Sequence, residues 1–391
     1  MIFQAIDDKE ECIGVYAEGK LHFDSFPDPL THTWKYTGSL KDHTPRSAWI
    51  RASGRTLADC CPIEFSEELA AAQNKMRAYI KSFTIAKVDL NDHCVFDLIP
   101  HDFLLSFCEL KNKITEHVFE AFTEPANYQH LESVQRLLHK IKYQKLNLNS
   151  ENCRNLFYSS RDRSKANSLI QNYKYIDYNL FGTVTGRLTT NPESFPILTL
   201  KKAYRNLLKP NNDLFVSLDY NAAEARTFIE LRGVSQPQKD IHQWNIENIF
   251  KHEEVTRDEA KTIFFAWLYN PESQQIQSDL YDRQKVLDKW YENGYIKTPY
   301  GREIQVEERK ALNYVIQSTT ADRVLTKAVE IDSFLNGKKS YISHIVHDEI
   351  VIDYADEDRE IIMQIKNIFE DGYLANIKGG RDYFNLMDLE L

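Results

Sequence analysis

The sequence contains no apolar run of the ~18–20 residues that a helix needs to cross a bilayer, and its N-terminus reaches acidic residues almost at once. We therefore expect neither a membrane-spanning helix nor a secretion signal. Glycine and proline are scarce, at 13 and 12 of 391 residues, whereas tyrosine and phenylalanine number 21 each. This composition excludes a largely disordered chain and allows two or three domains with apolar cores.

Cysteine is also sparse, and none of the six cysteines has the CxxC spacing of a zinc or redox site. Because no secretion signal is expected, these residues are predicted to be reduced thiols of an intracellular protein. The sequence thus favours free thiols over disulfides or a zinc cluster.

The net charge of −10 argues against a simple nucleic-acid coat, but the charges are unevenly distributed. Between positions 140 and 209 the chain carries 13 Lys and Arg against four Asp and Glu. A basic tract in an acidic chain indicates one surface that faces a polyanion, because phosphate contacts need several cations. A solvated helix face would give the same pattern.

The chain changes character along its length. Residues 1–62 combine short strand-like runs with turns, whereas residues 63–172 repeat apolar residues at helical spacing in long amphipathic segments. A buried-type strand, DLFVSLDY, ends at Tyr220, and a hairpin is expected to turn at Tyr300-Gly301. Between them, helices are expected over roughly 222–232, 240–251, 256–269 and 273–293, and a further helix begins near 308.

Two of the predicted strands carry acids. Asp219 lies at the end of DLFVSLDY, and the run IVHDEIVID at 345–353 places His347, Asp348 and Glu349 between β-branched residues. Burying a charge is costly unless it is paired or bound to a metal, so these acids are candidate metal ligands. The alternatives are a helix N-cap for Asp219 and a polar hairpin turn for the triplet.

Two predicted helices present polar side chains at four-residue spacing. Arg257, Lys261, Phe265 and Tyr269 fall on one stripe, because each step of four residues drifts by only ~40° around a helix. Two cations followed by two aromatics would suit a nucleoside triphosphate, although an amphipathic helix with a charged end would look the same. A second stripe, suited to base edges and sugar oxygens in a groove, comprises Arg309, Asn313 and Gln317.

In order and spacing, these segments resemble the motifs of family A DNA polymerases, the group of bacterial DNA polymerase I and its phage relatives. The resemblance covers roughly residues 175–391. The matching segments are TGRL (185–188), LDYNAAEAR (218–226), DIHQWNIENIF (240–250), RDEAKTIFFAWLYN (257–270), ERKALNYVIQSTTAD (308–322), VHDE (346–349) and IKGGRDYFNLM (377–387).

The resemblance implies an α+β fold of the right-hand polymerase type, with an antiparallel palm sheet, helical fingers, a helical thumb and a small N-terminal β-containing segment. The implied ranges are 1–62 for the β-rich N-terminal segment, 63–175 for the helical region including the thumb, 176–232 and 301–391 for the two parts of the palm, and 233–300 for the fingers.

The resemblance also implies a template-directed DNA polymerase, a nucleotidyltransferase that adds dNMPs to a primer 3′-OH and releases pyrophosphate. Its cofactors would be two Mg²⁺ ions, for which Mn²⁺ can substitute. Asp219, Asp348 and the backbone carbonyl of Tyr220 would hold the metals, with Glu349 outside the direct ligand set. Its partners would be primer-template DNA and dNTPs, and no membrane.

The family's roles carry over to further residues. Arg257, Lys261 and His242 would bind the triphosphate, and Lys261 would also give a proton to the leaving pyrophosphate. Phe265 would stack on the incoming nucleotide, and Glu224 with Phe265 would close the space beside C2′. Tyr269 would occupy the templating-base position when the fingers open. The residues expected to contact DNA, with His347 close to the primer end, are Arg187, Arg309, Asn313, Gln317 and His347.

Several positions depart from the family pattern, among them Ala222, Ala266, Asn270 and Ser318. They resemble the drift of a divergent phage enzyme, which would act in DNA replication in the host cytoplasm. Residues 1–100 show no exonuclease motif, so proofreading is expected to be absent from this chain or supplied, like a processivity factor, by a separate polypeptide.

Two alternatives stay open. A single-subunit RNA polymerase-like enzyme would share the palm, and Glu224 at the gate position argues against it. A catalytically inactive DNA-binding accessory protein would not need the Asp219 and Asp348 pair, which is intact.

Overall fold

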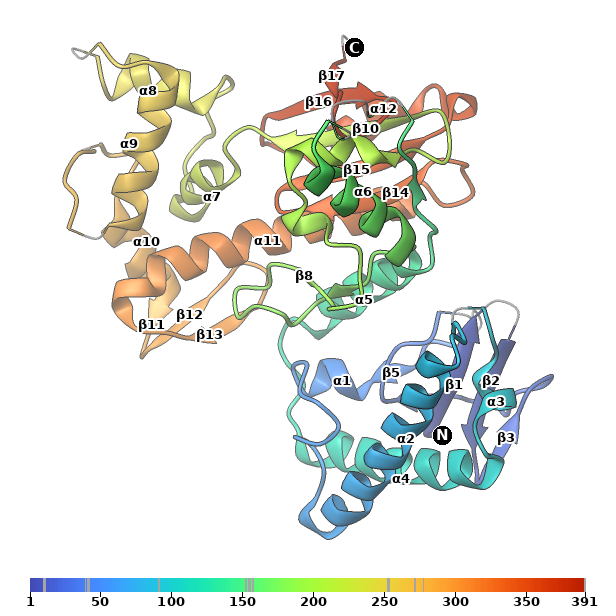
Figure 1. Ribbon diagram of the computed structural model, residues 1–391. Coiled ribbons are helices and arrows are strands. Elements are labelled where there is room, and N and C mark those ends of the chain that lie inside the picture. Colours follow the sequence, from blue (N-terminus) through green and yellow to red (C-terminus); the bar gives the residue numbers. More distant parts are fainter. Residues whose placement is uncertain are drawn as a thin grey trace. The chain divides into compact units, whose positions relative to one another are not determined.

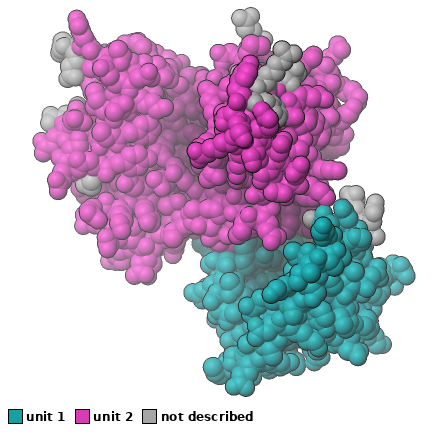
Figure 2. Space-filling model, in the orientation of Figure 1, with its two compact units in different colours: residues 1–136 teal, residues 137–391 magenta. Residues whose placement is uncertain are grey.

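The computed structural model describes the chain except residues 10, 11, 39, 41, 42, 91, 152, 154, 155, 157, 252, 253, 271, 277, 390 and 391, and only the backbone of Asp8 and Lys9. Arg154, one of the 13 basic residues counted above, lies outside the described residues. The fold is mixed α and β and divides into two compact units, residues 1–136 and 137–391 (Figure 2). The division falls inside the helical range predicted from sequence, and the subdomain names given to the predicted ranges stay predictions.

The first unit is built on an antiparallel sheet of order β1-β2-β3, formed by β1 (Phe3–Lys9), β2 (Cys12–Ala17) and β3 (Lys20–His22). Glu18 and Gly19 form the turn between β2 and β3 with φ of 49° and 78°, as a two-residue hairpin turn requires. The helices and minor strands of this unit are α1 (Ala48–Arg51), η1 (Ile63–Phe65), α2 (Ser66–Ile85), α3 (Val95–Leu98), α4 (His101–Ala121), β4 (His32–Thr33) and β5 (Arg46–Ser47). α5 (Tyr128–Lys142) spans the division between the units.

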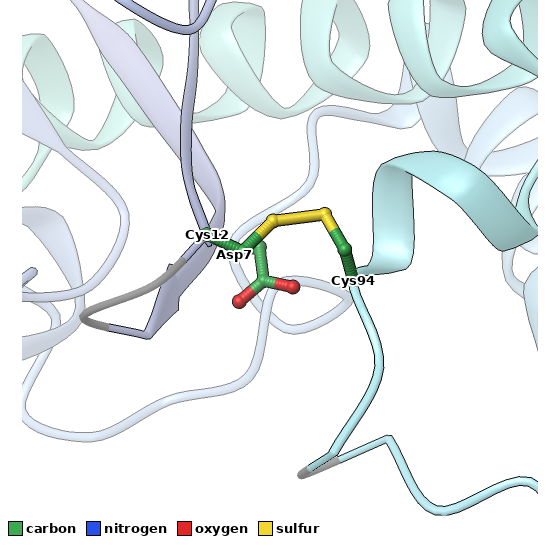
Figure 3. Close-up of side chains that lie close together, drawn as sticks. All are labelled: Asp7, Cys12 and Cys94. Atoms are coloured by element: carbon green, nitrogen blue, oxygen red, sulfur yellow. A yellow bond between two sulfur atoms is a disulfide. The ribbon is translucent and has the colours of Figure 1, made fainter.

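Cys12 and Cys94 form a disulfide between β2 and the residue that precedes α3, with Cα atoms 6.0 Å apart (Figure 3). The prediction that all six cysteines are reduced thiols is therefore wrong for this pair. The two residues are 82 positions apart, so no sequence spacing reveals that the fold brings them together. Asp7 lies beside them, and its carboxylate accepts a hydrogen bond from the Val95 backbone N–H at 3.0 Å.

The second unit contains a five-stranded antiparallel sheet of order β14-β15-β10-β16-β17 (Figure 1). β10 (Leu214–Tyr220) lies between β15 (Glu349–Tyr354) and β16 (Ala375–Gly380), so segments far apart in the sequence become neighbours. The outer strands are β14 (Tyr341–Val346) and β17 (Met387–Asp388). The sheet packs against α11 (Glu308–Phe334) and α12 (Ile361–Glu370).

A helical lobe of the same unit has its own apolar core. The lobe comprises α7 (Ala223–Arg232), α8 (Ile241–Asn248), α9 (Arg257–Tyr269), α10 (Arg283–Trp290) and the strands β11 (Tyr291–Glu292), β12 (Tyr295–Lys297) and β13 (Glu303–Gln305). The hairpin expected at Tyr300-Gly301 is confirmed by the pairing of β12 with β13. The helix expected over 273–293 is shorter, because Asp282 caps it and accepts a hydrogen bond from the Lys285 N–H.

Residues 137–209 add short elements beside the sheet. These are β6 (Asn147–Leu148), α6 (Ser160–Asn172), β7 (Tyr178–Asn179), β8 (Thr189–Thr190), η3 (Ile197–Thr199), η4 (Lys202–Leu207) and β9 (Leu208–Lys209), and η5 (Asp356–Asp358) follows β15. β6 pairs with β9, and β7 pairs with β8. No helix among the described residues combines the length and apolar character that crossing a membrane requires.

Candidate active site

Asp219 and Asp348 lie at the same end of the five-stranded sheet. Asp219 is the penultimate residue of β10 and stands opposite Glu349, the first residue of β15. Asp348 and His347 form the two-residue turn that joins β14 to β15. The structure therefore brings together the two acids that the sequence singled out, although 128 residues separate them.

The two acids sit in an environment that disfavours their charge. Burial raises the pKa of Asp219 to about 7, and the negative charges of Asp348 and Glu349 add to the effect, while Lys378 and Lys261 oppose it. The pKa of Asp348 is also raised, chiefly by burial. Carboxylates that are crowded in this way are stabilised by a nearby cation, and oxygen ligands suit Mg²⁺.

The turn that carries Asp348 has an unusual backbone. His347 adopts a left-handed conformation with φ of 57°, which costs a residue with a side chain roughly 1–2 kcal/mol. A two-residue hairpin turn needs such a conformation, and glycine would adopt it without strain. The His347 side chain is exposed at this turn. Strained backbone conformations of this kind are concentrated at functional sites, so the strain supports a functional role for His347.

The stripe of α9 is formed as the sequence predicts. The residues that α9 buries are Ala260, Phe264, Trp267 and Leu268. In the stripe, Arg257, Lys261 and Tyr269 are exposed, and Phe265 is half-buried against the core. A capping box of Thr256 and Glu259 fixes the start of the helix. The positive charge of Lys261 acts on Asp219, so this helix faces the acidic end of the sheet.

Arg257 is already paired with an acid that the sequence analysis did not single out. Its guanidinium donates to both carboxylate oxygens of Asp240, at 3.3 and 2.7 Å. Asp240 also caps α8 and accepts a hydrogen bond from the Asn221 side-chain amide at 2.6 Å. Its position before a helix is a recognisable capping signal, but its pairing with Arg257 is a tertiary contact.

His242 is the second residue of α8 and is almost completely buried, at 2% exposed. Burial lowers its pKa to about 4, so the imidazole is neutral near pH 7. Its Nδ1 atom has no hydrogen-bond partner in the described part of the chain. A neutral imidazole can still donate one hydrogen bond to a phosphate oxygen, as the predicted role requires.

Glu224 joins Arg187 and Tyr269 in one network. The Arg187 guanidinium and the Tyr269 hydroxyl each donate to a different oxygen of the Glu224 carboxylate. The Tyr269 ring stacks on Phe265 with ring centroids 6.0 Å apart. Burial and the hydrogen bond to Glu224 raise the pKa of Tyr269, so its hydroxyl stays protonated. Four predicted site residues thus form one connected group.

The predicted DNA-contacting residues lie on two elements near this network. Arg309, Asn313 and Gln317 share a face of α11 and are at least partly exposed, and Gln317 also lies within hydrogen-bonding reach of the Tyr269 hydroxyl. Arg187 and His347 line a small cleft together with Leu188, Ala321, Leu325 and other residues. The structure therefore brings Arg187 and His347 to the same hollow.

Two buried arginines that the sequence analysis did not single out fix the loops around the site. The Arg226 side chain, 0% exposed, donates to the backbone carbonyls of Asn221, Pro237 and Lys239. Arg302 makes a two-fold ion pair with Asp322 of α11, at 2.9 and 2.7 Å. The sequence gives little indication of these structural roles, because a buried arginine cannot be distinguished from an exposed one by its sequence position.

Glu349 is the third acid at this end of the sheet, and it has two partners. Its carboxylate accepts hydrogen bonds from the Ser217 hydroxyl at 2.6 Å and the Tyr383 hydroxyl at 2.7 Å. Burial and the charge of Glu349 raise the pKa of Tyr383. Neither Ser217 nor Tyr383 is marked for this role by a pattern in the sequence.

Considered together, two crowded acids, an adjacent cationic helix and a cleft with a flanking arginine form a site suited to a divalent metal and a phosphate ester. The chain is also similar in sequence to known proteins. The chain is 26% identical over 248 residues to the thermostable DNA polymerase I of Thermus aquaticus, covering 50% of this chain and 30% of the relative. It is 26% identical over 268 residues to the DNA polymerase of Bacillus phage SP01, covering 51% of this chain and 29% of the relative.

A third relative is the DNA polymerase I of Deinococcus radiodurans, 24% identical over 238 residues, with 48% of this chain and 25% of the relative covered. The chain thus spans less than a third of the length of these curated relatives. A search of solved structures finds the polymerase domain of Pol1 from M. smegmatis in complex with DNA primer-template and dNTP, with a TM-score of 0.45 and 16% identity over 85% of this chain and 69% of that one.

No protein-family model matches the chain. The resemblance that the motifs carry is nevertheless confirmed in sequence: the chain is similar to bacterial and phage DNA polymerases over about half of its length.

Proposed function

We propose that the chain is a template-directed DNA polymerase that adds dNMPs to a primer 3′-OH and releases pyrophosphate. The observation that carries the proposal is the meeting of Asp219 and Asp348 at one end of an antiparallel sheet, facing the cationic stripe of α9. In this proposal the sheet with α11 and α12 is the palm, residues 233–300 are the fingers, and the thumb lies within residues 63–175.

The residues fit a divalent metal. Asp219 and Asp348 offer carboxylate oxygens, and the backbone carbonyl of Tyr220 offers a third. The pKa of Asp219 is raised by burial and by the neighbouring acids, and a cation bound between the acids would offset both effects. Two Mg²⁺ ions would supply activation of the primer hydroxyl and charge neutralisation at the leaving group, and Mn²⁺ suits the same oxygen ligands.

The protein's own residues would bind and orient the incoming nucleotide. Arg257 and Lys261 would hold the triphosphate, with His242 donating a further hydrogen bond from its buried position. Lys261 would give its proton to the leaving pyrophosphate. Arg257 is paired with Asp240. A phosphate that binds Arg257 therefore has to share the guanidinium with the Asp240 carboxylate or displace this carboxylate.

Glu224, Phe265 and Tyr269 would select the nucleotide. The Phe265 ring would pack on the sugar and base, and Glu224 beside it would exclude a ribose 2′-OH. Tyr269 would lie in the place of the templating base until a nucleotide enters. The hydrogen bond from Tyr269 to Glu224 supports this arrangement, because it holds both side chains in one position.

Primer-template DNA would lie along Arg187, Arg309, Asn313 and Gln317, with His347 near the primer end. The basic tract of residues 140–209 supplies further cations for the phosphate backbone. We also propose that proofreading comes from a separate polypeptide, if at all, and that the enzyme acts in replication in a host cytoplasm.

Primer extension tests the proposal. Purified protein with Mg²⁺, dNTPs and primed template should extend the primer, and Asp219→Ala or Asp348→Ala should abolish extension while DNA binding persists. Asp356→Ala is the matched control, because this exposed acid follows the other end of β15. A wild-type protein without extension would refute the function, and an active Asp219→Ala variant would refute the metal site.

The same assay decides between the alternatives. Preference for rNTPs over dNTPs would favour an RNA polymerase-like enzyme, and DNA binding without any extension would favour an accessory protein. A primer with a mismatched 3′ end, which a proofreading chain would trim, tests the assignment of proofreading to another polypeptide.

A further inference from the structure

Three acids reach the same end of the sheet, but they are held differently. Glu349 stands directly opposite Asp219 in the pairing of β15 with β10, so the two side chains share a face of the sheet. The Asp219 carboxylate accepts no hydrogen bond from any residue that the structure describes. Glu349, by contrast, has a hydroxyl donor on each carboxylate oxygen, Ser217 on one and Tyr383 on the other.

The position of these donors turns the Glu349 carboxylate away from Asp219. Ser217 precedes Asp219 by two residues on β10, so its side chain lies on the same face, about 7 Å back along the strand. Consistent with this direction, Asp219, Asp348 and Glu349 do not form a three-ligand cluster in the described part of the chain, where the only such cluster is the one that contains Asp7.

Tyr383 is itself fixed by its surroundings. Its side chain is 1% exposed, and its backbone N–H donates to the Leu208 carbonyl at 3.1 Å. The Arg205 guanidinium lies 4.7 Å from the ring centroid, and the His344 ring packs edge-on at 4.7 Å. A hydroxyl on such a rigid ring can hold a carboxylate in one place.

We propose that Tyr383 and Ser217 are positioning residues that keep the Glu349 carboxylate out of the metal site. The proposal rests on the proposed function only for the identity of the metal ligands, Asp219 and Asp348. A cation then meets two acids instead of three. Because the number of charged ligands sets the affinity for a hard cation, a metal ion held by Asp219 and Asp348 alone would bind more weakly than one that Glu349 also ligated.

Direct binding of Mn²⁺ to the full chain, without nucleotide or DNA, tests this proposal. Free Mn²⁺ is measured by its electron paramagnetic resonance signal during titration. Tyr383→Phe and Ser217→Ala each release one oxygen of Glu349, and we expect each to tighten Mn²⁺ binding by about three- to tenfold. Loss of structure would weaken binding, so a gain cannot come from damage to the fold.

Two further sets of variants complete the experiment. Adding Glu349→Gln to either variant should remove the gain, because the released group is then uncharged. Tyr341→Phe is the matched control: its hydroxyl donates to the Asp353 carboxylate at 3.1 Å in the same hairpin, and its loss should leave Mn²⁺ affinity unchanged.

The outcomes separate this proposal from the function. Affinity that is unchanged or weaker in both Tyr383→Phe and Ser217→Ala overturns the positioning role, even if the enzyme polymerises DNA. Affinity that is insensitive to Asp219→Ala overturns the metal ligands of the proposed function instead. A gain that persists with Glu349→Gln also overturns the proposal, because Glu349 is then not the added ligand.

Discussion

Two acids near opposite ends of the paired strands β10 and β15 have contrasting environments. At one end, Asp353 accepts hydrogen bonds from the backbone N–H groups of Asn211 and Asn212, at 2.7 and 2.8 Å, and from the Tyr341 hydroxyl. At the other end, Asp219 has no hydrogen-bond donor among the described residues and faces Asp348 and Glu349. The first acid is held by hydrogen bonds within the fold, and the second is the metal ligand that we propose.

The largest expected effect tests this contrast at Asp219. The variant Asp219→Asn keeps the shape of the side chain and removes its charge, so extension should fall by about a thousandfold, equivalent to ~4 kcal/mol. Stability in the absence of metal should not fall, because the change relieves repulsion between acids. Primer extension and chemical denaturation measure the two properties, and a less stable Asp219→Asn protein would contradict the contrast.

The reverse pattern is expected at Asp353. Asp353→Asn replaces one accepting oxygen by a donating NH2 group, so at least one backbone N–H loses its acceptor, which should lower the free energy of unfolding by about 1–3 kcal/mol. Extension by the folded protein should change little, because the hydrogen bonds lie away from the acidic pair. Urea denaturation checks the loss, and an inactive but fully stable variant would show that Asp353 has been misassigned.

Glu224 tests whether an acid with hydrogen-bond donors can also be functional. Its carboxylate accepts hydrogen bonds from Arg187 and Tyr269, as Asp353 does from its own donors, and yet we propose that it selects the nucleotide. Glu224→Ala should raise incorporation of rNTPs relative to dNTPs by about tenfold, since one blocked contact in a pocket discriminates by ~1–3 kcal/mol. Competition between the two nucleotides on one template measures the ratio. An unchanged ratio would show that Glu224, like Asp353, has only a structural role.

The smallest effect concerns two histidines of the hairpin. His344 is fully buried on β14, and burial lowers its pKa to about 3, whereas His347 is exposed at the turn. Below pH 6.5 the unfolded chain protonates His344 and the folded chain does not, so stability falls as the pH decreases. Between pH 7 and 5.5 this single group should cost the wild type ~1 kcal/mol.

His344→Asn checks this assignment, because the difference in unfolding free energy between variant and wild type should shrink as the pH falls over that range. A constant difference at His344 would show that its burial does not set the acid sensitivity of the hairpin.

Local patterns were enough to predict one part of the site. The stripe on α9 follows from helical geometry over 13 residues, and the acids at 219 and 348 follow from strand-like runs that end in charge. Contacts between residues far apart in the sequence could not be predicted in this way. Tyr383 contacts Glu349 from 34 residues away, and the Cys12–Cys94 disulfide spans 82, so neither contact leaves a periodic trace in the sequence.

Asp240 shows an intermediate case. Its place before α8 identifies it as a helix cap, but its ion pair with Arg257 depends on how α8 and α9 pack. The same holds for the antiparallel order of the sheet, in which β10 enters between two strands that follow it by more than 120 residues. The strand order depends on how the whole unit packs, and strand propensity does not predict it.

The backbone at Gly186 lies against the Arg302 side chain, which links the loop of Arg187 to α11. Its φ is 80°, and a Cβ atom added there would come within 2.4 Å of the Arg302 guanidinium, which is anchored to Asp322 on α11. The loop that presents Arg187 is therefore braced directly on the helix that presents Gln317. We expect this loop and α11 to move together, so that the spacing between Arg187 and Gln317 stays the same if α8 and α9 change position.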